Sequence, residues 1–398
     1  MRRRLRGLAL GLSVGFAAVF LAGMVFTRNL ALEGTYTYLK LFNEALTLIR
    51  SSYVDEVSTD SLMKGAYTGL LSELDPFSEY LTSEEHAQYL AARSASPSAG
   101  PKADTGLRVL RREGVLTIVA VRKGSDAEAR GITPGDQLRR IGDQSTREMT
   151  LLQAEAALAG ESGSAVALTL LRREEPHKLE ASVERREPAR ESATLTVIDA
   201  KEGIGVLRVP HFRPGTASEI ASLLDRPDGP RLGRLLIDLR GNAWGTMEEA
   251  ARAAGLFVGD TVVARLKARE EVAEEVHSGR AKASWDGIVA VLINGSTAEA
   301  AELFAEAVKE GRPAALIGEG SFGVGAEQEL IPLRNGAWLK LSVRKYVSPA
   351  GTTWHGKGLT PDTVVAAGTE GPYPDRLGAQ LTKAVEFLRG YKPGSGIG

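Results

Sequence analysis

Hydrophobic residues recur at near-helical spacing through the first folded part of the chain. Between residues 36 and 90, apolar side chains follow one another at steps of about one helical turn, as at Leu39, Phe42 and Leu46. This period predicts amphipathic helices. The sequence SELDP at 72–76 ends a second helix, because proline cannot continue one. We predict a helical N-terminal segment over residues 29–90.

The hydrophobic period stops after this segment. Residues 91–105, AARSASPSAGPKADT, are small and rich in Ser and Pro. Such composition predicts a flexible linker and a domain boundary. Short strand-like runs then follow, LRVL, LTIVAV and AVALTLL, with a turn at 131–136 and a helical LLQAEAALAG. Residues 106–175 are therefore predicted to form a small β-rich module with one late helix.

The second half of the chain alternates between strand and helix patterns. After a charged joint at 172–191, strands such as LGRLLIDLR and GIVAVLING alternate with helices such as TMEEAARAAGLF. This order is typical of α/β layers. We predict an α/β core over residues 190–368, followed by a C-terminal helix and tail over residues 369–398. The fold class is α/β, or α+β when the β-rich module is included.

The N-terminus combines a positive cluster with a long apolar run. Four arginines within the first six residues precede the uncharged residues 7–27, and Arg28 closes the run. At 1.5 Å per residue this run is long enough to cross about 30 Å of hydrocarbon. We predict a basic cytoplasmic stub and a transmembrane anchor over residues 1–28, with an extracytoplasmic body, periplasmic or at the cell surface. A cleaved signal peptide is the alternative, although no clear A-x-A site follows.

Composition narrows the classes of function. Lys+Arg 49 against Asp+Glu 50 gives a net charge of -1, so no global basic field is present to attract nucleic acid. The absence of cysteine removes disulfides, thiol nucleophiles and cysteine-ligated metals. The five histidines lack the spacing of a metal motif, and we expect no metal and no cofactor. Their expected roles are on the surface or in turns; they are His86, His177, His211, His277 and His355.

Eight motifs in order resemble one protein family. Their sequences are YVDEV at 53–57, LDPFSEYL at 74–81, GLRV at 106–109, GITPGDQLRRIGDQ at 131–144, LLIDLRGN at 235–242, VLINGSTAEAAE at 291–302, IGEGSFGVGAEQ at 317–328 and YVSPAGTTWHGKGLTPD at 346–362. The β-rich module resembles a PDZ domain, and the chain as a whole resembles the carboxyl-terminal processing (tail-specific) proteases. The resemblance implies a core of the ClpP/crotonase-like kind.

The PDZ resemblance implies a peptide-binding strand. In PDZ domains the residues that match Gly106, Leu107, Arg108 and Val109 bind a peptide's terminal carboxylate and pair with it as an added strand. The alternative is that these four residues only begin a strand. Residues 134–136 are better explained as a turn, because Pro fixes φ and Gly tolerates a positive φ.

The family's serine/lysine dyad is not present in the sequence. The resemblance places the nucleophilic serine three residues before Glu302, where this chain has Glu299. It places the general-base lysine inside a TFGKG-like turn, which here reads SFGVG with Val324 in that position. The 25-residue separation matches the spacing that the family leads us to expect. A glutamine one helical turn beyond the lysine position is retained as Gln328.

A third change lies in the loop that the resemblance assigns to the oxyanion hole. A family sequence similar to NNPGG here reads GNAWGT at 241–246, with Trp244 in place of the first glycine. We expect the Trp244 side chain to crowd the acyl-binding space, while Gly245 retains a backbone donor. We expect Glu302 to be a partner of the helix dipole or a cap, and allow Glu299 an ion-pairing role that closes the cleft.

These changes predict a membrane-anchored homologue that is catalytically inactive. It is expected to bind unfolded or C-terminal peptide segments, or to pair with an active relative in a homo-oligomer or hetero-oligomer. The alternative is an active serine-type endopeptidase with a relocated nucleophile or base. Its candidate residues are Ser296, Thr297, Ser321, Lys340 and Lys345. A third hypothesis is a structural anchor that oligomerises through the helices at 36–90 and 378–389.

Overall fold

The structure of the chain is a computed structural model. It describes residues 36–94, 103–147, 149–172, 178–187, 193–225, 231–269, 271–279, 283–367 and 373–391. Two compact units are present, one ending at Leu70 and the other beginning at Leu71. The membrane anchor predicted at residues 7–27 lies outside the described residues. No helix among those described is long and apolar enough to cross a membrane.

The described residues of the first unit, from residue 36 onward, are mostly helical, as predicted. Residues 36–52 form one helix, and α2 covers Thr59–Ser72. In the second unit, β1 (Glu79–Leu81) and α3 (Ser83–Ser94) follow. The prediction of a wholly helical segment to residue 90 is wrong at β1, which pairs with a strand of the core more than 250 residues later. At the ends of the predicted linker, residues 91–94 continue α3 and residues 103–104 form β2.

The β-rich module forms an antiparallel sheet beside one main helix. The sheet has the order β3-β4-β5-β8-β9, with short β6 beside β5. Strands β2 and β7 pair with each other in a separate two-stranded sheet. The elements of the module are β2 (Ala103–Asp104), β3 (Leu107–Arg112), β4 (Val115–Val121), α4 (Asp126–Ala129), β5 (Gln137–Ile141), β6 (Gln144–Ser145), α5 (Leu151–Leu158), β7 (Ala159–Gly160), β8 (Ala165–Leu171) and β9 (Lys178–Glu184). The sheet therefore extends past the predicted boundary at residue 175.

Helix α5 begins where the sequence supplies a capping box. The Thr150 hydroxyl accepts the Gln153 N–H, and the Gln153 side chain accepts the Thr150 N–H. This reciprocal pair satisfies two donors that would otherwise lack partners at a helix start. The buried face of the helix, Leu151, Ala154 and Leu158, packs into the core of the module. The helix is thereby held beside β3, with which it forms the module's groove.

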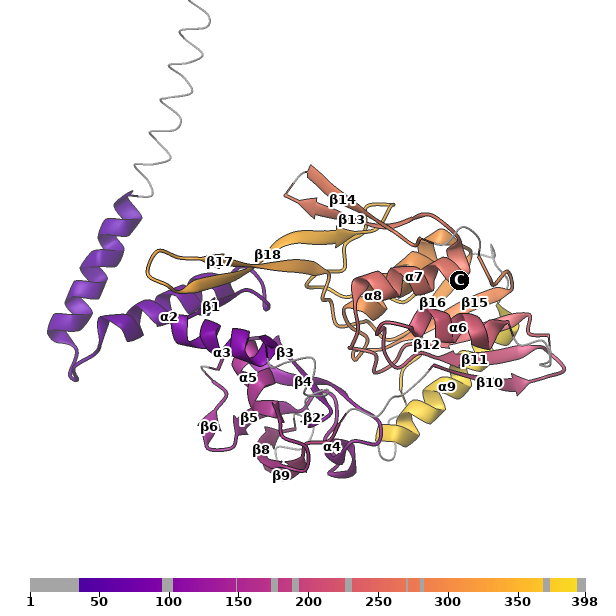
Figure 1. Cartoon of the computed structure of the whole chain (residues 1–398), viewed down its shortest axis with the longest axis horizontal. Helices are drawn as coiled ribbons and strands as arrows, with labels where there is room; N and C mark the ends of the chain where they lie inside the picture. The colour runs from indigo at the N-terminus through magenta and orange to yellow at the C-terminus, as the bar shows by residue number, and fades with distance from the viewer. Residues whose placement is uncertain are drawn as a thin grey trace, which may run out of the picture. The chain divides into compact units, whose positions relative to one another are not determined.

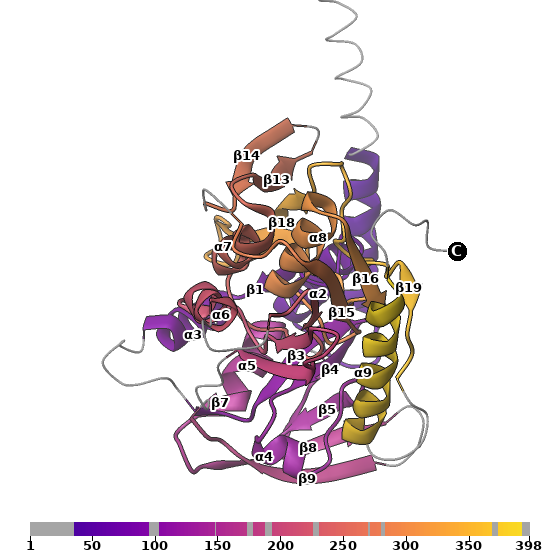
Figure 2. The same ribbon diagram turned by 90° about the vertical axis from the view of Figure 1, so that its right-hand side faces the viewer.

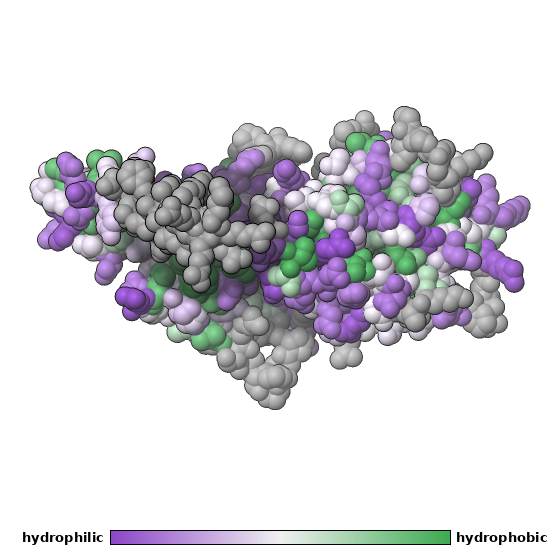
Figure 3. Space-filling model, turned by 90° about the horizontal axis from the view of Figure 1, so that it is seen from above, coloured by the Kyte–Doolittle hydropathy of each residue, from purple (hydrophilic) through white to green (hydrophobic). Residues whose placement is uncertain are grey.

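The α/β core is a six-stranded sheet covered by helices on both faces (Figures 1 and 2). Neighbouring strands from β11 to β19 are parallel, and β10 is antiparallel at the edge. The strands, in spatial order, are β10 (Thr194–Asp199), β11 (Ile204–Arg208), β12 (Arg234–Asp238), β15 (Ile288–Ile293), β16 (Ala314–Gly318) and β19 (Thr363–Val364). Figure 3 shows hydrophobic residues interspersed among hydrophilic ones on one face of the molecule.

Alternating residues of the sheet pack against the two helical layers. Ile237 and Val291 belong to the cluster that α6 (Thr216–Leu224), α7 (Met247–Val258) and α8 (Ala300–Gly311) share. Their neighbours Leu236 and Leu292 pack instead with α9 (Tyr373–Gly390). This alternation follows from the two-residue period of a strand and explains the continuous apolar runs of these strands in the sequence.

A third sheet connects the segment before the β-rich module to the core. It has the order β1-β18-β13-β14, with β17 also paired to β18. Its remaining strands are β13 (Val262–Ala268), β14 (Glu271–His277), β17 (Ala326–Pro332) and β18 (Trp338–Val347). The β17–β18 hairpin is the long orange pair in Figure 1. Because β1 pairs with β18, the end of the LDPFSEYL segment forms the edge strand of this third sheet.

The parallel sheet brings two loops together at its carboxyl edge. The loop after β12 and the loop after β15 follow neighbouring parallel strands. Thr297 Oγ1 donates to the Leu239 carbonyl at 3.0 Å, and the Ala298 N–H donates to the Asn242 carbonyl at 2.9 Å. The GNAWGT loop and the residues leading to Glu299 are thus held side by side, as is usual for sites in parallel α/β sheets.

Candidate functional site

Glu299 stands at the start of α8 in a strained conformation. Its φ is 56° and its ψ is -117°, a region that residues with a side chain rarely occupy. The Glu299 N–H donates to Glu302 Oε2 at 3.0 Å, which fixes the turn. Strain of this kind persists only where the surroundings enforce it, and it is concentrated at functional sites. The conformation at Glu299 is therefore one that its surroundings hold in place, the Glu302 carboxylate among them.

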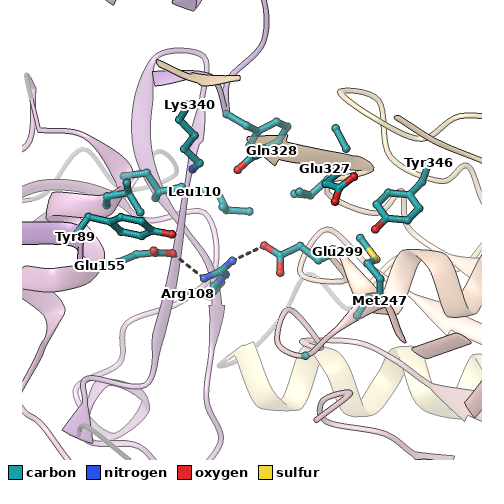
Figure 4. A pocket seen from close by; sticks show the side chains of 17 residues that line it. Tyr89, Arg108, Leu110, Glu155, Met247, Glu299, Glu327, Gln328, Lys340 and Tyr346 are labelled. Atoms are coloured by element: carbon teal, nitrogen blue, oxygen red, sulfur yellow. Dashed lines mark hydrogen bonds and ion pairs between the residues drawn. The ribbon is translucent and has the colours of Figure 1, made fainter. Parts of the chain in front are cut away.

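The Glu299 carboxylate forms an ion pair with Arg108 of β3 (Figure 4). The other terminal nitrogen of Arg108 donates to Glu155 Oε1 of α5 at 2.7 Å. Arg108 is about three-quarters buried, with 24% of its side chain exposed. Burial opposes its charge, but the two carboxylates outweigh burial and raise its pKa. A cation of β3 thus links the β-rich module to the position that the resemblance assigns to the nucleophile, and the ion pair foreseen for Glu299 is present.

Val324 lies in the turn formed by residues 321–325. Its side chain is buried and lines the same pocket as Glu299. Its methyl groups carry no lone pair, so this side chain cannot accept a proton. Gln328 also lines the pocket, from β17. The structure therefore gathers the two dyad positions and the retained glutamine around one space.

Glu302 connects these two positions. It is fully buried, and its carboxylate accepts hydrogen bonds from the Ser321 hydroxyl at 2.5 Å, from the Gly323 and Val324 N–H groups at 2.8 Å, and from the Glu299 N–H. Burial raises its pKa to about 7, and these hydrogen bonds oppose the rise. The predicted capping role accounts for the Glu299 bond alone. The link to the 321–325 turn was missed, because it joins segments that local pattern does not relate.

Trp244 packs against the β-rich module and is not among the residues that line the pocket. Its ring lies under the Arg122 guanidinium, 5.3 Å from ring centroid to Cζ, and packs against the module's core cluster. The pocket is lined instead by Gly245. The expectation that the Trp244 side chain crowds the acyl-binding space is therefore wrong. A Cβ on Gly245, which has a φ of 135°, would lie 2.4 Å from the Phe212 carbonyl oxygen, so only glycine fits there.

The four predicted peptide-binding residues have different environments. Gly106 has a φ of 75°, and its N–H donates to Asp104 Oδ1 at 2.7 Å. The Asp104 carboxylate is in turn paired with Arg122. Leu107 is half-buried, and Val109 is buried in the module's core. Arg108 is the one of the four that lines the pocket.

The pocket has a volume of about 500 Å³ and lies between the module and the core. Its wall on the module side comes from β3 and α5, and its wall on the core side comes from α7, α8 and the third sheet (Figure 4). Its lining includes charged and aromatic residues that the sequence did not single out. These are Tyr89, Glu155, Glu327 and Tyr346.

The hydroxyl groups offered as relocated nucleophiles are buried, and those of Thr297 and Ser321 are hydrogen-bonded within the fold. Ser296 and Thr297 are buried, and Thr297 Oγ1 is bonded to the Leu239 carbonyl. Ser321 Oγ donates to Glu302 and accepts the Leu359 N–H at 2.6 Å. Lys340 lines the pocket, 3.8 Å from its Nζ to Glu79 Oε2, whereas Lys345 is exposed on β18. None of these contacts pairs a hydroxyl with a lysine.

Histidine and carboxylate side chains form no metal centre in the described part of the chain. No group of three or more such side chains there is placed to hold a metal ion. His86 stacks on Trp338 with ring centroids 3.9 Å apart, and His355 is buried against Phe77. His177 lies outside the described residues.

Comparison with known proteins identifies the family. Family models match three parts of the chain: the activating protease CtpB N-terminal domain at residues 26–85, the PDZ domain at 98–171 and peptidase family S41 at 203–365. The carboxy-terminal processing protease CtpA of Bacillus subtilis is 30% identical over 320 residues, which cover 80% of this chain and 67% of that protein. The chain belongs to peptidase family S41. The resemblance to the carboxyl-terminal processing proteases with a PDZ domain is confirmed.

Two further proteins are similar to this chain over most of its length. A probable CtpA-like serine protease of Staphylococcus aureus (strain N315) is 28% identical over 323 residues, 80% of this chain. The chain spans 63% of the length of that S41 relative. The solved photosystem II D1 C-terminal processing protease matches with a TM-score of 0.66 and 21% identity, covering 88% of this chain and 96% of that one. This last likeness confirms the mixed α/β protease fold.

Proposed function

We propose that this chain is a non-catalytic member of family S41 that binds peptide segments through its PDZ module. The observation that carries the proposal is the ion pair between Glu299 and Arg108. A carboxylate that is bonded to a guanidinium stands where the family resemblance requires a serine. Val324 stands where it requires the lysine that would deprotonate that serine.

The loss of both groups removes the covalent mechanism rather than slowing it. A nucleophilic serine and its base act as a unit, and removing them from a serine protease costs about a millionfold in rate. A carboxylate beside the oxyanion loop also opposes a developing negative charge. Gly245, which retains its backbone donor next to the pocket, does not restore a nucleophile.

The binding function rests on the groove between β3 and α5. This groove opens into the pocket, whose lining combines leucine side chains with Arg108. Peptides add to such grooves as an extra strand. We expect the ligands to be unfolded or C-terminal segments of proteins, presented alone or within an assembly with an active relative.

The proposed function includes a membrane anchor at residues 7–27. The arginine cluster before residues 7–27 supports a single-pass anchor with a cytoplasmic N-terminus and a periplasmic or cell-surface body. An anchored binding protein would keep captured segments close to the membrane. A working endopeptidase with a relocated nucleophile is the second candidate, and the buried, bonded hydroxyls of Thr297 and Ser321 weigh against it.

One experiment tests binding and cleavage together. The full chain is incubated with a denatured reporter protein that ends in a free apolar C-terminus, and products are followed by mass spectrometry while binding is followed by fluorescence anisotropy. We expect saturable binding without new reporter termini. Turnover that disappears in the Ser296→Ala or Thr297→Ala variant would overturn the proposal, and so would the absence of any binding.

A further inference from the structure

The PDZ groove and the residue-299 site share one pocket. Arg108 and Leu110 line it from β3, and Leu151, Leu152 and Glu155 line it from α5. Glu299 and Val324 line it from the core. A ligand that enters the groove therefore meets groups of the module and of the core at the same time (Figure 4).

Strand β3 offers a free edge for such a ligand. Among the strands that the structure describes, β3 is the end strand of its sheet and pairs with β4 alone. Unpaired N–H and C=O groups along an edge strand are the usual template for an added peptide strand. The leucines beside this edge give the added strand an apolar surface on which to pack.

Arg108 is the cationic donor at this edge. Two carboxylates bind its terminal nitrogens, while its Nε is buried and has no hydrogen-bond partner within the described part of the chain. The Gly106 N–H is already bonded to Asp104. Of the four residues that begin the strand, Arg108 is thus the one whose donors face the pocket. A guanidinium binds a carboxylate with two parallel hydrogen bonds, and Nε is one of the two donors that can form such a pair.

The two carboxylates now on Arg108 differ in origin. Glu155 belongs to the same module and faces Arg108 across the groove, whereas Glu299 comes from α8 of the core. A ligand carboxylate can take the place of Glu299 without changing the number of charges around Arg108. The Glu299 side chain is 22% exposed, so water can solvate it after release. Glu299 has the advantage of being tethered, which gives it a high effective concentration.

We propose that Arg108 is the carboxylate-binding residue of this pocket and that Glu299 competes for it from within the chain. The ligand class is a peptide that places a carboxylate beside an apolar side chain, which packs against the half-buried Leu152 in the wall of the pocket. The carboxylate comes from an acidic side chain or from the peptide terminus. This inference rests on the proposed function, since it names the ligand of the same groove.

The test uses four forms of one fluorescent peptide with an apolar end. The penultimate residue is Asp or Asn, and the C-terminus is free or amidated, so the two carboxylate sources are separated. Anisotropy gives Kd for the full-length wild type, for Glu299→Gln and for Glu275→Gln. Glu275 of β14 pairs with Arg265 at 3.0 Å and is not among the residues that line the pocket, which makes its variant the matched control for the loss of one paired carboxylate.

We expect Glu299→Gln to bind carboxylate peptides at least about tenfold more tightly than the wild type, the factor that about 1.4 kcal/mol provides. The amidated Asn peptide should bind the wild type and Glu299→Gln equally, and Glu275→Gln should match the wild type with every peptide. The peptides whose affinity increases in Glu299→Gln identify the source of the carboxylate: those with Asp if it is the side chain, and those with a free C-terminus if it is the peptide terminus. An Arg108→Gln exchange added to Glu299→Gln should abolish the gain.

Two results would overturn the inference. If Glu299→Gln changes the affinity of all four peptides by the same factor, or of none, then Arg108 does not select a carboxylate. The proposed peptide-binding function would survive that result. If no peptide binds to any of the proteins, the proposed function fails together with this inference.

Discussion

Replacing Glu302 by Gln tests how the two dyad positions are held together. Glutamine has nearly the same shape as glutamate, but it has one oxygen acceptor where the carboxyl group has two. Glu302 Oε1 accepts from Ser321 and Gly323, and Oε2 accepts from Val324 and Glu299. In the best orientation of the amide, its NH₂ group faces the Ser321 hydroxyl, which can turn to accept. The Gly323 N–H, which shares Oε1 with Ser321 in the wild type, then faces the NH₂ group of the amide and has no acceptor.

The expected cost follows from that single orphaned donor. A buried N–H without a partner costs about 1–3 kcal/mol, so we expect Glu302→Gln to lower the free energy of unfolding by about 2 kcal/mol at pH 5. Urea unfolding followed by tryptophan fluorescence gives this value. Amide hydrogen exchange at Gly323 and Val324 locates the loss. A change below about 0.5 kcal/mol with unchanged exchange would refute the reasoning.

The pH dependence gives the same variant a second readout. Burial raises the pKa of Glu302 to about 7, from an ordinary value of 4.5. Between these values the folded state keeps a proton that the unfolded state has lost, so the stability of the wild type falls as pH rises through this window. Glutamine does not titrate. The difference in unfolding free energy between the wild type and Glu302→Gln should therefore be largest near pH 5 and become smaller toward pH 8. A difference that increases with pH would contradict the raised pKa of Glu302.

Glu306 supplies the matched control. It lies one turn further along α8, is also buried, and has a pKa raised to about 7 by burial and by the neighbouring Glu310. Glu306→Gln removes a like charge next to Glu310. It should leave stability unchanged at pH 5 and increase it at pH 8. Equal losses in the two variants would mean that the cost comes from altering any buried glutamate of α8.

Three further substitutions test separate contacts. Gly245→Ala should destabilise the core by more than about 2 kcal/mol in urea unfolding, because its Cβ would meet the Phe212 backbone at a φ of 135°; a neutral result would mean that this loop shifts freely. Thr150→Ala removes the cap of α5 and should cost about 1 kcal/mol, read from faster amide exchange in the first turn of that helix. Glu299→Gln should change the unfolding free energy by at most about 1 kcal/mol, because Glu155 stays paired with Arg108 and the amide oxygen can still accept from the guanidinium; a larger loss would make Glu299 structural rather than a competitor.

The elements that periodicity could predict are local ones. The helical segment before residue 73, the strands and late helix of the PDZ module, and the α/β order of the core follow from hydrophobic spacing. Strand β1 was missed, because its three residues form a strand only by pairing with β18. Short segments of that kind carry too little pattern to separate them from the helices around them.

The candidate site was predictable in its positions but not in its contacts. Alignment of motifs identified Glu299, Val324 and Gln328, and the structure brings all three to one pocket. The pairing of Glu299 with Arg108 joins residues 191 positions apart, and neither residue's neighbours indicate the other. The direction of Trp244 was also unpredictable, because it depends on Arg122 of a different module. Contacts between modules are set by packing, which a one-dimensional pattern does not contain.

The central claim is that position 299 holds no nucleophile in this chain. The most direct measurement compares wild type with the Glu299→Ser/Val324→Lys double variant in cleavage of one denatured reporter, with new termini identified by mass spectrometry. We predict no cleavage by the wild type and cleavage by the double variant, in which both dyad groups are restored to the pocket. Wild-type cleavage equal to that of the double variant would contradict the claim.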